Sequence, residues 1–184
     1  MALIEDANMS DFAIAYAFLI TKEGSLSDNS KDLGGLTYKG IARKYHPDWE
    51  GWKFIDAGDF ESANPLVFTF YKSEYWDKYG INFVYNQSIA NRLFEQIVNG
   101  GEHIPISNLQ TILNAISPID ALKVDGAIGN NTINKLNKLS NNSSYAKAIE
   151  FALRCTYVNF LIGRAIEEPS QSVFTVGWIN REMT

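Results

Sequence analysis

The chain has 184 residues, of which 46% are apolar and 20% are charged, and 16 Lys and Arg against 21 Asp and Glu give a formal net charge of −5. This is an ordinary globular composition, sufficient for one compact domain or two small lobes. An acidic chain without a basic run has no electrostatic reason to bind nucleic acid. The longest apolar stretch, from Phe12 to Ile20, is shorter than the roughly 20 residues that span a bilayer, so no membrane span is expected.

Helical periodicity dominates the sequence, so the predicted fold class is all-α with at most a small β-hairpin. A first helix is expected over residues 11–23, followed by a polar, glycine-containing loop over residues 24–37 that could form the hairpin. Thr37 is expected to cap a helix that ends at His46, because Pro47 disfavours helical backbone in the residue before it. Asp48 to Ala57 is predicted to be a helix or turn. Further helices are predicted from Asn64-Pro65 to Trp76 and over residues 86–98, 107–116, 131–139, 144–166 and 171–181.

A break at Asn99-Gly100-Gly101 suggests two lobes, which we place at residues 1–92 and 93–184. The break is too short to be a linker, and each lobe is small for a core of its own. We therefore expect the lobes to share one core, with the long helix over residues 144–166 packed against the amino-terminal lobe.

The histidines and glycines of this chain do not have the spacing that a zinc site or a nucleotide-binding loop requires. His46 and His103 have no ligand at zinc-site distance along the chain, and the glycines match neither nucleotide-binding pattern. Cys155 falls in an apolar helical pattern and is expected to be a buried structural thiol, with a Cys-His nucleophile pair as the alternative. No metal and no cofactor are expected.

Glu23 closes the first predicted helix. The C-terminal end of a helix carries partial negative charge, which disfavours an ionised glutamate. Partial desolvation beside an apolar face raises the pKa in the same direction. A glutamate that is protonated near neutral pH can act as a general acid toward a glycosidic oxygen. A solvated glutamate at a fraying helix end is the alternative.

The residues that follow Glu23 resemble phage-type lysozymes and, more closely, glycoside hydrolase family 108, the N-acetylmuramidases also known as secretion activators. That family has Glu-Gly-Gly, then Asp-x-Gly-Gly-x-Thr, then Gly-Ile or Gly-Val. The corresponding segments here are Glu23-Gly24-Ser25, Asp32-Leu33-Gly34-Gly35-Leu36-Thr37 and Gly40-Ile41. Ser25 replaces the second glycine of the first segment, which changes the turn but keeps the acid.

The resemblance extends along nearly the whole chain. Tyr75-Trp76-Asp77, Val98-Asn99-Gly100-Gly101 and the closing Gly177-Trp178-Ile179-Asn180-Arg181 are similar to family segments. Leu109-Gln110, the run from Val124 to Gly129, and Thr132 are similar to a peptidoglycan-binding helical repeat fused to this enzyme. From the residues alone, Asp125-Gly126 predicts a turn, with direct sugar contact as the alternative.

The resemblance implies a lysozyme-like bacterial enzyme that cleaves the β-1,4 bond between N-acetylmuramic acid and N-acetylglucosamine in peptidoglycan. In this interpretation Glu23 is the general acid. Asp32 is the first candidate to stabilise the oxocarbenium charge and Asp28 the second, and Thr37 is the candidate to hold the attacking water.

Candidate substrate-binding residues are Asp28 and three aromatic residues close to the acid loop in sequence, Tyr38, Trp49 and Trp52. The implied partner is the glycan strand, with a holin or secretion machinery as a candidate route to it. An acidic amino terminus predicts no Sec signal. We therefore expect a protein that is made in the cytoplasm and acts in the periplasm or cell wall after export or lysis, as a phage endolysin does. We also expect it to be a monomer.

Two other classes of function are compatible with this sequence. The first is a non-catalytic peptidoglycan-binding or secretion-regulating protein. The second is a lytic transglycosylase, in which a hydroxyl of the substrate closes an anhydro ring and a single glutamate is enough.

Overall fold

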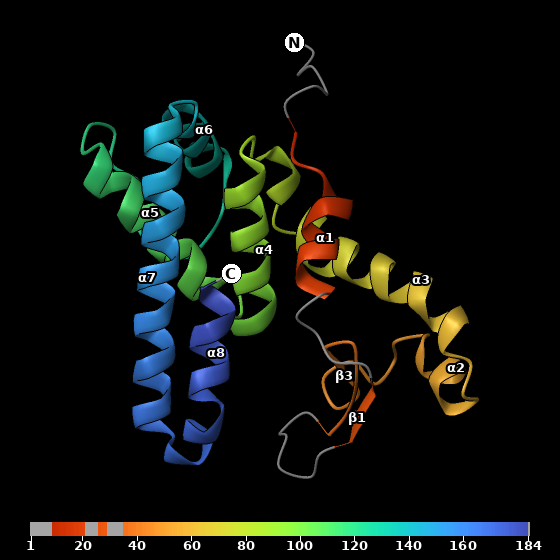
Figure 1. The fold of residues 1–184 in the computed structure, drawn as a ribbon. Helices are drawn as coiled ribbons and strands as arrows, with labels where there is room; N and C mark the ends of the chain where they lie inside the picture. The colour runs from red at the N-terminus through yellow and green to blue at the C-terminus, as the bar shows by residue number, and fades with distance from the viewer. Residues whose placement is uncertain (1–8, 21–25, 29–34, 184) are drawn as a thin grey trace. The chain divides into compact units, whose positions relative to one another are not determined.

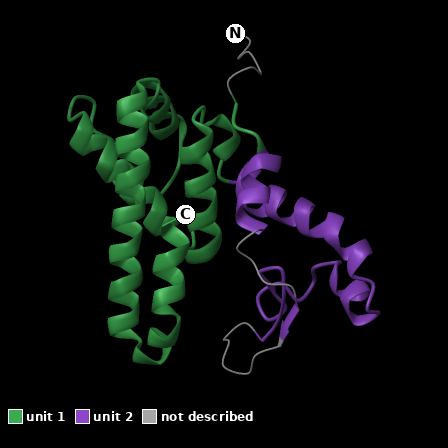
Figure 2. Cartoon of the chain, viewed as in Figure 1, with its two compact units in different colours: residues 1–11, 79–184 green, residues 12–78 purple. Residues whose placement is uncertain are grey.

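The computed structural model describes residues 9–20, 26–28 and 35–183. The chain forms two compact units, one of residues 1–11 and 79–184 and the other of residues 12–78 (Figure 2). Both are mostly helical, and a small antiparallel sheet is present in the second (Figure 1). The predicted all-α fold class is thereby confirmed. No helix in the described ranges is both long and apolar enough to cross a membrane.

The unit of residues 12–78 combines helices with the small sheet. Its elements are α1 (Phe12–Ile20), β1 (Leu26–Asp28), β2 (Leu36–Tyr38), β3 (Ile41–Ala42), α2 (Trp52–Asp56), α3 (Phe60–Tyr71) and a π-helical segment, η2 (Lys72–Asp77). The strands pair in the order β1-β2-β3, both pairs antiparallel.

Aromatic rings hold α1 against α3 and η2. Phe12 and Tyr16 lie on α1, and their ring centroids are 4.7 and 5.0 Å from that of Phe68 on α3. Phe12 also lies 5.5 Å from the ring of Trp76, which is 2% exposed on η2. Large rings bury the most apolar area per residue, so this cluster forms much of the core of a small unit.

The predicted helix from Thr37 to His46 is wrong, because this stretch forms β2, a tight turn and β3. Lys39 and Gly40 connect the strands with φ values of +45° and +82°. Positive φ at both central residues matches the twist of a two-residue hairpin and is incompatible with a right-handed helix. Tyr38 pairs with Ile41 across the turn, and both side chains are buried.

The helix expected to begin at Asn64-Pro65 begins earlier. Asp59 is the N-cap of α3, and its carboxylate accepts a hydrogen bond from the Ser62 backbone N–H at 3.1 Å. Pro65 therefore lies inside α3. The predicted Trp-bearing helix after Asp48 is present as the short α2.

The larger unit is a helical assembly. Its elements are η3 (Ile81–Phe83), α4 (Gln87–Gly100), α5 (His103–Ile116), α6 (Asn130–Ser140), α7 (Ser143–Glu167), η4 (Pro169–Phe174) and α8 (Thr175–Glu182). α7 is its organising helix, because it packs against α4, α5, α6 and α8.

Four of the predicted helices of this unit agree with the structure to within their ends, and the fifth, over residues 171–181, is divided into the 3-10 helix η4 and the α-helix α8. Asn86 and Asn142 cap α4 and α7 by accepting hydrogen bonds from backbone N–H groups in the first turn. Cys155 on α7 is exposed, so the expected buried thiol is wrong. An apolar neighbourhood along the sequence did not decide which face of α7 the cysteine occupies.

A buried polar cluster connects α8 to α4. Arg92 and Glu95 on α4 are 1% and 0% exposed, and their side chains lie 2.7 Å apart. Glu182 on α8 lies 3.4 Å from Arg92 and accepts a hydrogen bond from the Gln96 side chain at 2.9 Å. These contacts offset part of the cost of removing the charges from water.

The division at residues 92 and 93 and the shared core stay predictions. The helix α4 spans that position, and within its own unit it packs against α5 and α7. Its side chains at Ile89, Leu93, Phe94 and Ile97 are almost completely buried.

A fragment of residues 1–98 is expected to be insoluble or molten. It ends inside α4 and lacks α5, α7 and α8, so the apolar face of α4 loses its partners, and Arg92 keeps Glu95 but loses Glu150 and Glu182. Near-ultraviolet circular dichroism and thermal unfolding of the fragment check this. A fragment that unfolds cooperatively would contradict the shared core.

Candidate functional site

The small sheet brings several of the predicted site residues close together. Thr37 lies on β2 opposite Ser27, and Asp28 lies on β1 opposite Leu36. The Thr37 hydroxyl donates a hydrogen bond to the Gly35 carbonyl at 3.0 Å. That bond fixes the threonine rotamer, while its oxygen keeps acceptor capacity.

The two acids proposed first lie outside the described residues. Glu23 stands between α1 and β1 in the sequence, and Asp32 stands between β1 and β2. Their catalytic roles therefore stay predictions, as do those of Thr37 and Asp28.

Tyr38 and Trp52 are buried, each with 3% exposure. The Tyr38 hydroxyl donates to Asn64 Oδ1 at 2.9 Å, and burial raises its pKa. The Trp52 indole N–H donates to the His46 carbonyl at 2.7 Å, and the Arg43 guanidinium lies 5.2 Å from its ring centroid. Neither ring presents an open face in this structure, so they position neighbouring groups. Their role in sugar stacking is a prediction.

Trp49 is half-buried and lies among other rings. Its centroid is 6.5 Å from that of Tyr38, 5.1 Å from that of Trp52 and 6.3 Å from that of Phe70. The ring therefore has a fixed orientation. It also lines a cleft of about 460 Å³ formed by residues 45–50 together with α3 and η2, which we call the His46 cleft.

The sequence analysis missed this cleft because it treated His46 as a helix-end residue. The imidazole packs edge-to-face on Phe70 at 4.8 Å. Burial lowers the pKa of His46, and the Glu74 carboxylate opposes that effect. The available signal was the presence of aromatic and acidic residues together in the segment from Tyr45 to Glu50, but the meeting of His46 with Glu74 depends on tertiary structure.

A second cavity of about 870 Å³ lies in the helical unit, between α5, the segment after it and α6. Gln110 on α5 forms one wall and is 2% exposed. Its amide nitrogen donates to Asp125 Oδ1 and to the Ala127 carbonyl, both at 3.0 Å. Its amide oxygen accepts from the backbone N–H groups of Asp125 and Gly126, at 3.0 and 3.1 Å. One side chain therefore fixes the whole Asp125-Gly126 turn.

The turn predicted at Asp125-Gly126 is present. Asp125 Oδ1 accepts from the Ala127 N–H at 3.1 Å, and the Gln110 hydrogen bond holds the pKa of this carboxyl below its usual value. Gly126 has a φ of +70°, and a Cβ here would lie 2.5 Å from the His103 ring. Glycine is therefore required both by the backbone conformation and by close packing.

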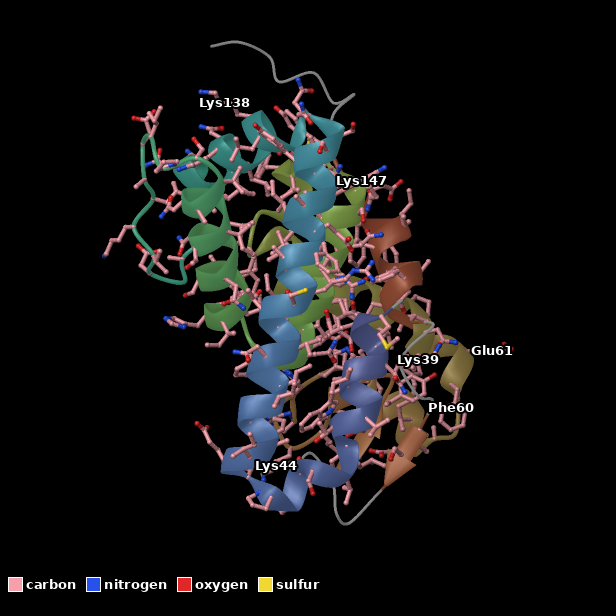
Figure 3. The ribbon with its side chains drawn as sticks, turned by 60° about the vertical axis from the view of Figure 1, so that its left-hand side comes forward. Lys39, Lys44, Phe60, Glu61, Lys138 and Lys147 are labelled. Carbon is pink, nitrogen blue, oxygen red and sulfur yellow. The ribbon has the colours of Figure 1, made fainter. Side chains whose placement is uncertain are left out.

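Lysines contribute to this second cavity in different ways. The Lys135 ammonium lies within 3.3 Å of four oxygens, Asn114 Oδ1 and the carbonyl oxygens of Ser117, Ile119 and Asp120, which share its three N–H donors. It thus holds the chain that leaves α5. Lys138, also on α6, is exposed (Figure 3).

These features define a helical protein with a lysozyme-like fold, and comparison with known proteins gives its family. Residues 16–101 match the model of glycosyl hydrolase 108, and residues 104–183 match that of a predicted peptidoglycan domain. The two matches support assignment of the chain to glycoside hydrolase family 108, with a peptidoglycan-binding domain. It is therefore a peptidoglycan hydrolase or binder.

A solved structure supports the fold. The structure of SagA from Brucella abortus has a TM-score of 0.68 and 23% sequence identity, over 94% of this chain and 89% of that chain. A comparison with curated proteins gave no match.

Replacing Gln110 with leucine is expected to lower the free energy of unfolding by about 1–3 kcal/mol, because the N–H groups of Asp125 and Gly126 lose their acceptor. Urea denaturation gives this difference. Asn134→Ala, which changes an exposed amide on α6, is the matched control and should shift stability by less than about 0.5 kcal/mol. Equal effects of the two substitutions would contradict the role assigned to Gln110.

Proposed function

We propose that the chain is an N-acetylmuramidase that hydrolyses the β-1,4 bond between N-acetylmuramic acid and N-acetylglucosamine, with Glu23 as the general acid. The observation that carries the proposal is the presence, in one chain, of a glycosyl hydrolase 108 segment and a peptidoglycan domain. The glycosyl hydrolase segment indicates hydrolysis of glycosidic bonds, and the peptidoglycan domain indicates which polymer is the substrate.

The position of Glu23 in the sequence supports its role. It follows α1, whose nine residues from Phe12 to Ile20 are all apolar or aromatic. A carboxyl that follows such a helix meets the negative end of the helix dipole, which favours the protonated form. A protonated carboxyl can donate to the leaving glycosidic oxygen.

The supporting groups come from the sheet and the loop before it. In this proposal Asp32, with Asp28 as second candidate, stabilises the positive charge that develops on the sugar ring. Thr37 positions the attacking water through the acceptor capacity of its hydroxyl, while its proton is directed to the Gly35 carbonyl. Of the proposed sugar-contacting rings, Trp49 is half-buried and lines a cleft.

The substrate also sets the place of action. A hydrolase of this polymer must act in the periplasm or cell wall, so we propose that it reaches the wall by export or lysis, through a holin or secretion machinery. We propose that it acts as a monomer.

Product analysis distinguishes this proposal from its two alternatives. Mass spectrometry of digested peptidoglycan should show reducing muramic ends, because hydrolysis adds water across the bond. Anhydro ends would identify a lytic transglycosylase instead. Intact glycan would identify a binding or secretion-regulating protein.

Glu23→Gln is expected to lower activity on purified peptidoglycan by at least ~100-fold, because glutamine keeps the size but cannot transfer the proton. Its unfolding free energy should change by less than about 1 kcal/mol. Glu167→Gln is the matched control, since Glu167 is an exposed glutamate at the end of α7, and it should retain full activity. A folded Glu23→Gln protein with more than about a tenth of the activity would exclude Glu23 as the acid.

A further inference from the structure

We propose that the His46 cleft is a saccharide subsite that binds an uncharged N-acetylglucosamine residue and rejects the charged muramoyl peptide. This inference rests on the proposed function and names which part of the glycan the cleft takes. It is carried by three features: a fixed aromatic platform, a set of carboxylate acceptors of which one lies on a π-helical segment, and the sign of the charge around them.

The platform is the Trp49 ring. Its T-shaped contacts with Trp52, at 5.1 Å, and with Phe70, at 6.3 Å, restrict its rotation. Tyr45 at the rim is 60% exposed, and the Lys44 ammonium lies over its ring, 5.6 Å from the centroid. Fixed rings lose little conformational entropy when the apolar face of a sugar packs against them.

The acceptors include carboxylates at the edge of the platform. Glu74 lies on η2, and Asp48 and Glu50 lie beside Trp49 in the chain; all three are exposed and line the cleft. π-Helical segments are rare and often coincide with functional sites, since they redirect side chains that a regular helix would place elsewhere. Ionised carboxylates accept strong hydrogen bonds, here from sugar hydroxyl and amide N–H groups.

His46 completes the polar lining. Because burial lowers its pKa below the ordinary value, the imidazole is neutral at pH 7 and offers one donor and one acceptor. It is held at 4.8 Å against Phe70, with its backbone carbonyl bonded to the Trp52 indole. The histidine therefore supplies hydrogen bonds without adding positive charge.

The charge of the cleft decides between the two sugars of peptidoglycan. With His46 neutral, the charged groups among its described lining residues are the carboxylates of Asp48, Glu50 and Glu74. Muramic acid carries a stem peptide with negatively charged carboxylates, which these groups repel at close range. N-acetylglucosamine has no charge and meets no such penalty.

The test is a titration of the isotope-labelled full chain followed by nitrogen–proton correlation NMR. The probe is tri-N-acetylchitotriose, an uncharged chain of N-acetylglucosamine. Backbone signals of residues 45, 46, 48–50 and 66–74 and the Trp49 indole signal should move, while the Trp178 indole signal in the other unit stays in place. N-acetylmuramyl dipeptide should bind at least about tenfold more weakly.

Glu74→Gln should weaken chitotriose binding by at least about fivefold, because a charged acceptor is lost. The same variant should improve binding of the muramyl dipeptide, because repulsion falls. Glu61→Gln is the matched control: Glu61 is exposed on α3 and does not line the cleft (Figure 3). It should leave both affinities unchanged.

The outcomes separate this inference from the proposed function. Unmoved cleft signals in a chain that releases reducing muramic ends would overturn the subsite and leave the muramidase intact. Chitotriose binding at the cleft in a chain that cleaves nothing would support the subsite and overturn the muramidase. Equal binding of the two probes would overturn the charge selectivity.

Discussion

The buried guanidinium of Arg92 is the charge on which the helical unit depends. It is 1% exposed, and its partners come from three helices: Glu95 on α4, Glu150 on α7 and Glu182 on α8. A buried ion that loses its partner costs roughly 3–5 kcal/mol, so displacement of α8 would strand a charge as well as expose apolar surface. Arg154 on α7 adds a hydrogen bond to the Glu182 carbonyl at 3.1 Å. The last helix therefore has one favourable docking position, set by charge compensation as well as by shape.

The helix α7 connects the Arg92 cluster with the helices around the second cavity. This helix packs against α4 and α8 on the side of the charged cluster and against α5 and α6 on the side of the cavity. Gln110 on α5 then fixes the turn before α6, and Lys135 on α6 holds the chain that leaves α5. Two polar side chains thus order the segment that connects α5 with α6, which has no regular secondary structure over most of its length. Hydrogen bonds to buried side chains replace the backbone ladder that a helix or strand would provide.

A structural feature can be predicted from the sequence when residues close together in the chain determine it, and not when tertiary contacts do. Long amphipathic segments and their asparagine caps are local, so α7 was predicted over residues 144–166 and spans Ser143–Glu167. The hairpin at Tyr38 and Ile41 was not predicted, because residues that flank a two-residue turn have the same i, i+3 spacing as one helical turn. Only the backbone at Lys39-Gly40 separates the two interpretations. In the candidate site, nearness along the chain makes Trp49 a candidate, and Trp49 lines a cleft. Nearness along the chain does not reveal that Tyr38 and Trp52 are buried, or that His46 meets Glu74.

The Asp125-Gly126 motif illustrates why a family-like segment need not touch the ligand. The Gln110 amide and the Ala127 N–H are both bonded to one oxygen of Asp125, and the N–H of Gly126 is bonded to Gln110. The hydrogen bonds of Asp125 Oδ1 and of the Gly126 N–H are used within the turn, and Gly126 has no side chain to offer a ligand. The exposed residues that line that cavity beside the turn include Asn131 and Lys138. In the other unit, too, buried side chains orient a more exposed one. Tyr38 and Trp52 are buried and fix the orientation of Trp49, which lines the His46 cleft.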